Sequence, residues 1–128
     1  FNTSLANYMC GMFSYCENLT SLDLSNFDTK GVTDMNSMFS FCSSLKYLNI
    51  DNFDTRLVNN MALMFSHDTK LERLNMTSFD THNCDFFNLM FEGCINLLVI
   101  VNQVKCENLI MWIPEYVDKE IINTFFIN

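Results

Sequence analysis

The 26 residues Phe53–Ser78, FDTRLVNNMALMFSHDTKLERLNMTS, contain the pattern that decides the fold of this chain. The same skeleton returns when the frame is moved by 26 positions towards either end. The Met-Phe pairs are Met12-Phe13, Met38-Phe39, Met64-Phe65 and Met90-Phe91, and the Phe-Asp-Thr triplets begin at Phe27, Phe53 and Phe79. Two series of aliphatic residues recur with the same period: Leu19, Leu45, Leu71 and Leu97, and Leu22, Leu48, Leu74 and Ile100. A fixed period of this length predicts a solenoid, in which each repeat buries its apolar face only against its neighbours.

The first half of each repeat has apolar residues at positions i, i+3, i+6, i+7 and i+10, which is the stripe of a short helix. The residue before each expected helix start can cap it; these residues are Asn7, Thr33, Asn59 and Asp85. We therefore expect helices near residues 8–16, 34–42, 60–67 and 86–93.

The second half of each repeat reads L-x-x-L-x-L, and its last apolar positions alternate with polar ones. This alternation predicts a short strand with one buried face, and strands of successive repeats should pair in parallel. Phe27, Phe53 and Phe79 follow the strands and should stack in one row. The Asp and Thr that come next suit a turn towards the next helix. The expected fold is an α/β leucine-rich-repeat solenoid, with parallel strands on one face and short helices on the other.

The chain divides into repeats 1–26, 27–52, 53–78 and 79–104, followed by residues 105–128. Two interpretations of 105–128 remain open. In the favoured one it is a degenerate fifth repeat, with a helix starting near 113–115 because Pro114 fits only a first turn, and with strand spacing in Ile122-x-x-Phe125-x-Ile127. In the other, a capping helix covers 117–126. Because Phe1-Asn2-Thr3 resembles a Phe-Asp-Thr triplet, we expect the segment to be part of a longer protein.

Composition excludes several classes of function. The net charge is −8 and no basic stripe exists, so nucleic-acid binding is not expected. No apolar run approaches the roughly 20 residues that a membrane span needs. No nucleophile and base recur near a plausible pocket, and no glycine-rich phosphate loop is present. We predict no enzyme activity, catalytic residue or cofactor.

The fuller repeat, F-D-T-x-x-V-x-x-M-x-x-M-F-x-x-C-x-x-L-x-x-L-x-L, resembles the BspA-like leucine-rich repeats of bacterial and mycoplasma surface proteins. Residues 1–104 carry the pattern closely and 105–128 loosely. The resemblance implies a cell-surface or secreted protein with a role in adhesion or recognition. It names no ligand, because the motif encodes the scaffold.

Six cysteines and two histidines invite a metal or redox interpretation. Cys16, Cys42 and Cys94 share one repeat position and are expected to be buried thiols, since packed helices lie too far apart for easy disulfides. His82, Cys84 and Cys106 match no familiar zinc spacing. Aligned aspartates, Asp28, Asp54 and Asp80, could attract calcium, although each can instead cap its own turn. No metal site is predicted.

Outward residues of the predicted strands form parallel lines on one face, where ligand choice could reside. The lines are Ser21, Tyr47, Arg73 and Val99; Asp23, Asn49, Asn75 and Val101; and Ser25, Asp51, Thr77 and Gln103. The candidate partner-binding residues are Ser21, Asp23, Ser25, Tyr47, Asn49, Asp51, Arg73, Asn75 and Thr77. The leading prediction is a recognition module that binds a protein or glycan through this face. The alternative is a structural segment that docks end to end with further repeats or subunits.

Overall fold

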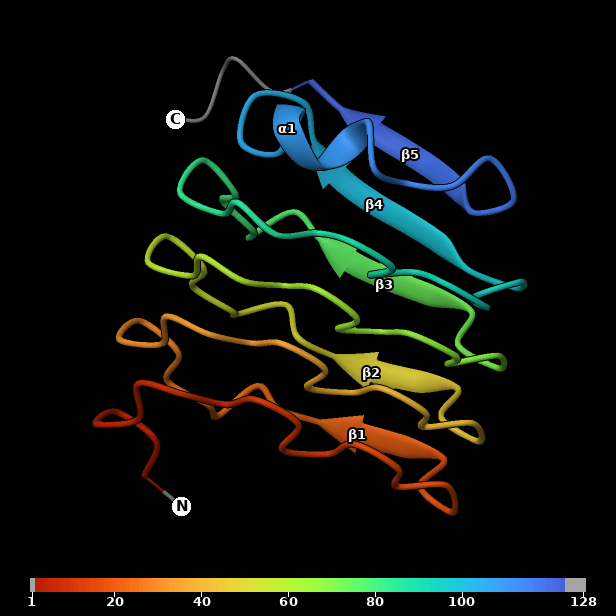
Figure 1. The fold of residues 1–128 in the computed structure, drawn as a ribbon, viewed down its shortest axis with the longest axis horizontal. Helices are drawn as coiled ribbons and strands as arrows, with labels where there is room; N and C mark the ends of the chain where they lie inside the picture. Colours follow the sequence, from red (N-terminus) through yellow and green to blue (C-terminus); the bar gives the residue numbers. More distant parts are fainter. Residues whose placement is uncertain (1, 124–128) are drawn as a thin grey trace.

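The computed structural model describes residues 2–123 and contains one five-stranded parallel sheet in the order β1-β2-β3-β4-β5 (Figure 1). The strands are β1 (Ser21–Asp23), β2 (Tyr47–Asn49), β3 (Arg73–Met76), β4 (Leu98–Asn102) and β5 (Asp118–Ile122). One four-residue helix, α1 (Glu107–Ile110), lies between β4 and β5. None of the helices in the described part is long and apolar enough to span a bilayer.

Successive stretches of chain lie one above another, and we call them tiers: residues 2–26, 27–52, 53–78, 79–104 and 105–123 (Figure 1). On the strand side, Ser21 pairs with Tyr47 and Tyr47 with Arg73. On the opposite side, isolated bridges join Tyr8 to Asp34, Asp34 to Asn60 and Asn60 to Phe86. Both sides of a tier are therefore bonded through the backbone to the same side of the next tier.

The helices predicted at 8–16, 34–42, 60–67 and 86–93 are wrong, because these residues form consecutive turns. Alternate amide N–H groups in these stretches point at the next tier instead of back along the chain. Those of Met35, Ser37 and Phe39 donate to the carbonyls of Asn60, Ala62 and Met64 at 2.9–3.0 Å. An α-helix needs each N–H for the carbonyl four residues earlier, so this arrangement excludes it.

Two left-handed residues in each of the first four tiers interrupt the helical geometry further. They form two columns with φ between 57° and 77°, namely Gly11, Ser37, Leu63 and Leu89, and Tyr15, Phe41, His67 and Gly93. Bonds from N–H(i) to O=C(i−3) link the turns, as from Met38 to Met35 at 3.2 Å and from Cys42 to Phe39 at 3.3 Å. A three-residue turn repeat produces nearly the same apolar spacing as a helix, which is why periodicity alone misled.

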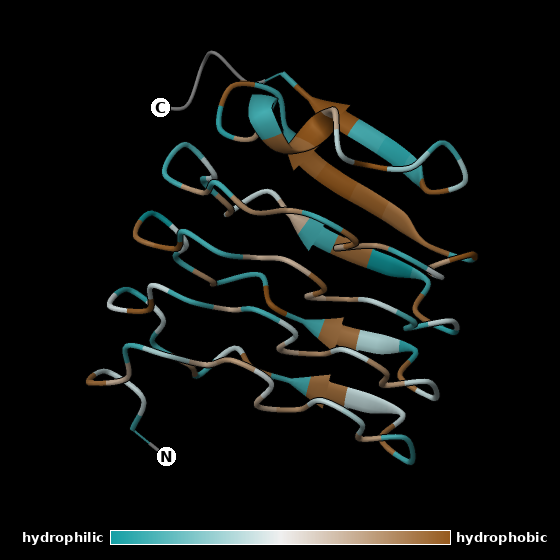
Figure 2. Ribbon diagram, viewed as in Figure 1, coloured by the Kyte–Doolittle hydropathy of each residue, from teal (hydrophilic) through white to brown (hydrophobic). Residues whose placement is uncertain are grey.

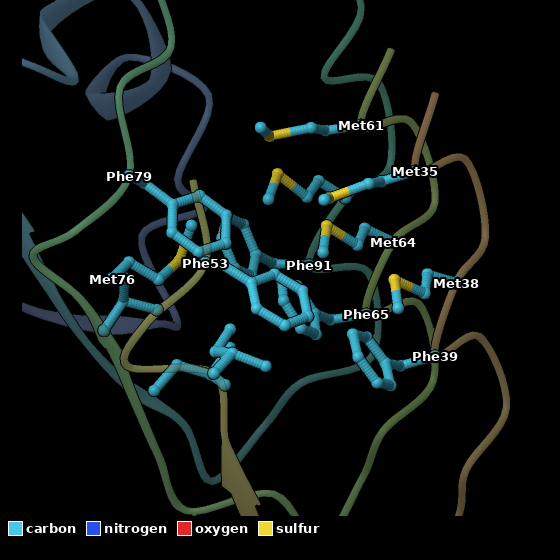
Figure 3. Packing of buried hydrophobic residues seen from close by; sticks show 14 of the residues in the cluster. Met35, Met38, Phe39, Phe53, Met61, Met64, Phe65, Met76, Phe79 and Phe91 are labelled. Atoms are coloured by element: carbon cyan, nitrogen blue, oxygen red, sulfur yellow. The ribbon is translucent and has the colours of Figure 1, made fainter. Parts of the chain in front are cut away.

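The core lies between the two sides of the tiers and is continuous through the stack. Phe39, Phe65 and Phe91 stack with ring centroids 5.6 and 5.8 Å apart, and Phe53 stacks on Phe79 at 6.3 Å (Figure 3). Methionines fill the space beside them; Met35, Met38, Met61, Met64 and Met76 are all fully buried. Flexible thioether side chains suit the irregular gaps between stacked rings.

The Phe-Asp-Thr triplets join each tier to the next through threonine. The Thr55 hydroxyl donates to the carbonyl of Asp80 at 2.8 Å and accepts the Asp80 N–H at 2.9 Å. Thr29 makes the same two bonds with Asp54, and Thr3 with Asp28. Each buried hydroxyl thus satisfies one donor and one acceptor where the chain leaves its strand.

The pairing of β3 with β4 differs from the prediction by one residue. Arg73 pairs with Leu98, not Val99, and Asn75 with Ile100, not Val101. Leu71 and Leu97 are equivalent buried residues, but the next inward residue comes three positions after Leu71 and only two after Leu97. A one-residue slip turns every side chain of a strand to the other face. Val99 and Val101 are therefore buried, and the proposed lines of outward residues end at β3.

The last tier supplies a strand but not where the sequence suggested. β5 pairs in register with β4, from Leu98 with Asp118 to Asn102 with Ile122. The capping helix over 117–126 is wrong where it can be judged, and so is the helix start near 113–115, because α1 ends before Pro114. The proposed strand spacing Ile122-x-x-Phe125-x-Ile127 lies mostly outside the described residues.

Candidate binding site on the strand face

The strand face is defined here by the outward residues of β1, β2 and β3: Ser21, Asp23, Tyr47, Asn49, Arg73 and Asn75. Each alternates with an inward leucine, so the outward side chains stand in rows across the three strands. Figure 2 shows the contrast with β4, which is hydrophobic along most of its length. The polar surface of the first three strands is therefore interrupted at β4, and polar residues resume on β5 with Asp118, Lys119 and Glu120.

These residues line an open depression of about 430 Å³. Its walls contain the six residues of the strand face, Asp51 beyond the end of β2, and the leucines Leu22 and Leu48. Seven of the nine candidate residues are thus brought together. Of the other two, Thr77 directly follows β3 and Ser25 comes two residues after the end of β1. Leu22 and Leu48 were missed because their ladder positions marked them only as core.

Local hydrogen bonds fix three of the polar side chains. Asp23 Oδ1 accepts the N–H of Ser25 at 2.9 Å, and Asn49 Oδ1 accepts the N–H of Asp51 at 3.0 Å. Asn75 Oδ1 repeats the turn by accepting the N–H of Thr77 at 3.1 Å and its hydroxyl at 2.7 Å. Such Asx turns hold a side chain in one position before any ligand arrives.

The same bonds determine which polar atoms remain for a ligand. The amide oxygens of Asn49 and Asn75 are already used, so the –NH₂ groups are the parts of these side chains left to donate. Hydrogen bonding from Ser25 lowers the pKa of Asp23, which keeps its carboxylate charged. The face therefore offers two amide donors in one row, beside a charged acceptor.

Tyr47 and Arg73 are neighbours across the β2–β3 pair. The Tyr47 ring is 62% exposed, and the Lys46 ammonium lies 5.6 Å from its centroid. Lys46 also lies 3.9 Å from Glu72, which is a weak surface ion pair. Tyrosine and arginine are both among the residue types enriched at the positions that contribute most to binding.

The aspartate row at the other corner of the tiers is occupied by local contacts. Asp28, Asp54 and Asp80 each accept the N–H of the residue two positions on. The side chains at those positions are basic, and each pairs with its own aspartate: Lys30 at 3.5 Å, Arg56 at 2.7 Å and His82 at 2.8 Å. Each aspartate thus has a local role, capping its own turn and contacting the basic side chain two positions on. No cluster of three metal-ligating side chains occurs within residues 2–123.

The described cysteines are free thiols, and four of the six are buried. Burial raises the pKa of Cys42 and Cys94 to about 12 and that of Cys84 and Cys106 to about 11. Cys42 donates to the carbonyl of Phe13 at 3.1 Å, and Cys94 to that of Phe65 at 3.0 Å. Protonated thiols in these positions are poor nucleophiles, so they serve packing.

Asp68 occupies the cysteine position of the third tier and is completely buried. Its Oδ1 accepts the N–H of Cys42 at 2.9 Å, whereas Oδ2 has no hydrogen-bond partner in the structure. Burial raises the pKa of this carboxyl to about 9. The group is therefore neutral at pH 7, and only the replacement of cysteine by aspartate at this repeat position could have pointed to it.

Comparison with curated proteins and with solved structures gives no match. A protein-family model described as "Mycoplasma protein of unknown function, DUF285" matches residues 7–111. The match begins in the first tier, includes β1 to β4, and ends just after α1. Because it includes most of the chain, this protein belongs to the DUF285 family of mycoplasma-type proteins.

Proposed function

We propose that this protein is a segment of a BspA-like leucine-rich-repeat solenoid that acts as a non-enzymatic recognition or adhesion module at the cell surface or in secreted form. The repeat motif, the tiered parallel sheet and the family match support the repeat class. The surface location follows from the resemblance of the motif to repeats of surface proteins.

One observation carries the choice of the strand face. Side chains from three different tiers, which are far apart in sequence, line one depression with Tyr47 and Arg73 side by side. The buried residues beneath them hold the tiers at a fixed register. The face is therefore a rigid platform on which side chains can change while the scaffold stays constant.

The test is binding of the labelled protein to cultured epithelial cells, measured by flow cytometry. The double variant Tyr47→Ala, Arg73→Ala should lose binding and keep the melting temperature of the wild type. A matched control, Tyr8→Ala with Arg56→Ala, removes the same residue types from exposed positions away from the strand face. Equal loss of binding in both double variants would contradict the proposal.

A structural role is the second candidate, and the first tier favours it. Phe13, Leu19 and Leu22 are only partly buried, whereas their equivalents one tier on are buried. This apolar end surface suits packing against a further repeat or subunit. Sedimentation should then reveal self-association that Leu19→Glu abolishes and that Tyr47→Ala, Arg73→Ala leaves intact. A monomer at all concentrations would contradict a role in self-assembly.

A further inference from the structure

We propose that the ligand of the strand face is a neutral oligosaccharide, bound by stacking on Tyr47, by hydrogen bonds that Asn49 and Asn75 donate, and by hydrogen bonds that the Asp23 carboxylate accepts. This inference rests on the proposed function, in which the strand face is the binding surface. It adds the chemical class of the ligand, and the evidence for it is the set of residues that line the depression.

The polar lining suits hydroxyl groups. A sugar hydroxyl both donates and accepts, so it is best bound by donors and acceptors that alternate at short distances. The depression supplies –NH₂ groups from Asn49 and Asn75 and carboxylates from Asp23 and Asp51. These groups repeat from strand to strand at about 4.8 Å, which suits adjacent hydroxyls of a chain lying across the strands.

The side chains are fixed before binding. The Asx turns of Asp23, Asn49 and Asn75 hold each group in place by a bond of 2.9–3.1 Å to the backbone two residues on. A weakly interacting ligand such as a sugar gains affinity when the site loses little freedom on binding. The turns provide this preorganisation at the same point of three successive tiers.

Tyr47 provides the apolar contact that a sugar ring needs. The residue paired with Tyr47 on β1 is the small Ser21, and the residue paired with it on β3 is Arg73. Serine is short, and the Tyr47 side chain is exposed although the Lys46 ammonium lies over one face of its ring, so the other face is the one that can stack on a sugar. The negative face of an aromatic ring attracts polarised C–H groups, which sugars present on one side of the ring.

Composition argues against a protein as the ligand. Aspartate and serine are depleted at the centres of protein interfaces, where aromatic residues, methionine and arginine are enriched. The lining contains Ser21, Asp23 and Asp51, against one aromatic residue and one arginine. Its volume of about 430 Å³ lies within the range of small-ligand sites.

Charge selects a neutral saccharide over an acidic one. The depression has two carboxylates and one guanidinium, and the whole chain has a net charge of −8. A sulphated or sialylated chain would meet repulsion from both. The polar strip ends at β4, where Leu98 and Ile100 replace polar residues, so it spans two strand spacings, roughly 10 Å. That width suits a short oligosaccharide.

The experiment measures binding of the full chain to an array of immobilised oligosaccharides. The neutral probes end in glucose, galactose, mannose or N-acetylglucosamine, and the acidic probes are sialylated or sulphated. We expect binding to at least one neutral probe and weaker binding to the acidic ones. Lack of binding to every neutral probe, or preference for an acidic probe, would overturn the inference.

Two variants separate a binding role from a structural one. Asn49→Asp with Asn75→Asp keeps the oxygen that accepts the backbone N–H but replaces the –NH₂ donor by a charged oxygen. We expect affinity for the neutral probe to fall by about tenfold or more, with unchanged melting. Tyr47→Phe should retain most binding, since it keeps the ring, and Tyr47→Ala should lose it. Unchanged affinity in the double variant would refute the assigned contacts.

The failure of this inference can be told apart from failure of the proposed function. If binding to cells depends on Tyr47 and Arg73 but survives enzymatic removal of cell-surface glycans, the strand face recognises a protein and only the saccharide inference fails. If Tyr47→Ala with Arg73→Ala changes neither cell binding nor array binding, the strand face is not the binding surface and both fail.

Discussion

The strand side and the turn side of each tier bury the same kind of apolar stripe with different backbones. On the strand side, Leu48 and Leu74 point inward from extended chain and alternate with polar residues. On the turn side, Met38 and Phe39 are buried by chained turns that contain two left-handed residues. Both sides bond to the next tier through alternate backbone groups. The comparison teaches that bonds between tiers can replace a helix wherever successive repeats keep the same length.

The largest effect should come from removing a ring on the turn side. Phe65 is fully buried and stacks between Phe39 and Phe91, so Phe65→Ala should cost about 3–5 kcal/mol of unfolding free energy, measured in urea. Leu74→Ala on the strand side should cost about 2–5 kcal/mol. If Phe65→Ala cost less than about 1 kcal/mol, the turn side would be a loose cover and the comparison would fail.

The second effect concerns the buried carboxyl on the turn side. The pKa of Asp68 is raised to about 9 in the folded protein, above an unfolded value of about 3.9. The folded state therefore holds the proton more tightly. The contribution of Asp68 to stability is therefore highest below about pH 4 and falls as the pH rises towards 9, because unfolding lets the carboxyl ionise in water.

Asp68→Asn removes this penalty and keeps an oxygen for the N–H of Cys42. We expect stabilisation by roughly 2–4 kcal/mol at pH 7, with little change at pH 4. The measurement is thermal unfolding of both proteins between pH 4 and 9. Asp85→Asn, at an exposed position of the next tier, is the matched control and should change neither stability nor its pH dependence. A gain that did not grow with pH would contradict a protonated Asp68.

The third effect tests the corner that connects the two sides. Thr55 is fully buried and makes two hydrogen bonds to the backbone of Asp80. Thr55→Val keeps the shape but leaves a buried N–H and carbonyl without this partner, so it should cost about 1–3 kcal/mol in urea unfolding. The exposed Thr20→Val should be close to neutral. Equal stability of the two variants would mean that the hydroxyl is not needed at the corner.

The smallest effect sharpens the contrast in backbone geometry. Leu89 has φ 57° and a side chain that is 54% exposed. Glycine adopts this conformation without the steric cost that other residues bear, so Leu89→Gly should stabilise the protein by roughly 0.5–1 kcal/mol. Ile95→Gly, which is as exposed but lacks a positive φ, should destabilise it slightly. Thermal melting of both variants measures the difference, and the same sign for both would count against a left-handed strain.

The sequence was sufficient to place three strands and the rows of the strand face, because Leu22, Leu48 and Leu74 repeat at a constant spacing. It could not distinguish a helix from a ladder of turns, since Met35, Met38 and Phe39 satisfy both patterns. The decisive difference lies in where each N–H points, which depends on the neighbouring tier. Pairing beyond β3 also could not be read, because Leu98 and Val99 are both apolar and either could face inward.

The candidate site was accessible to sequence reasoning only in outline. Tyr47 and Arg73 could be placed side by side from the repeat alone. The fixing of Asn49 and Asn75 by their own turns could not, because it depends on side-chain geometry after the strand end. For Asp68 the sequence contained two conflicting indications. The cysteines at the same position of the other repeats indicated a buried site, whereas the charge of an aspartate argued against burial.

The one-residue shift in the pairing of β3 with β4 indicates where this protein tolerates insertions and deletions. On the turn side the offset between bonded residues stays at 25 from the first tier to the fourth, as from Met35 to Asn60 and from Met61 to Phe86. A deletion there would misalign several hydrogen bonds at once. Near Leu97, where the chain enters β4, the spacing is one residue shorter, and the β3–β4 pairing has shifted by one residue to accommodate it. Insertions and deletions of single codons should therefore accumulate at strand entries, and gene duplications should copy whole tiers. An engineer lengthening the stack should cut and splice at the same places.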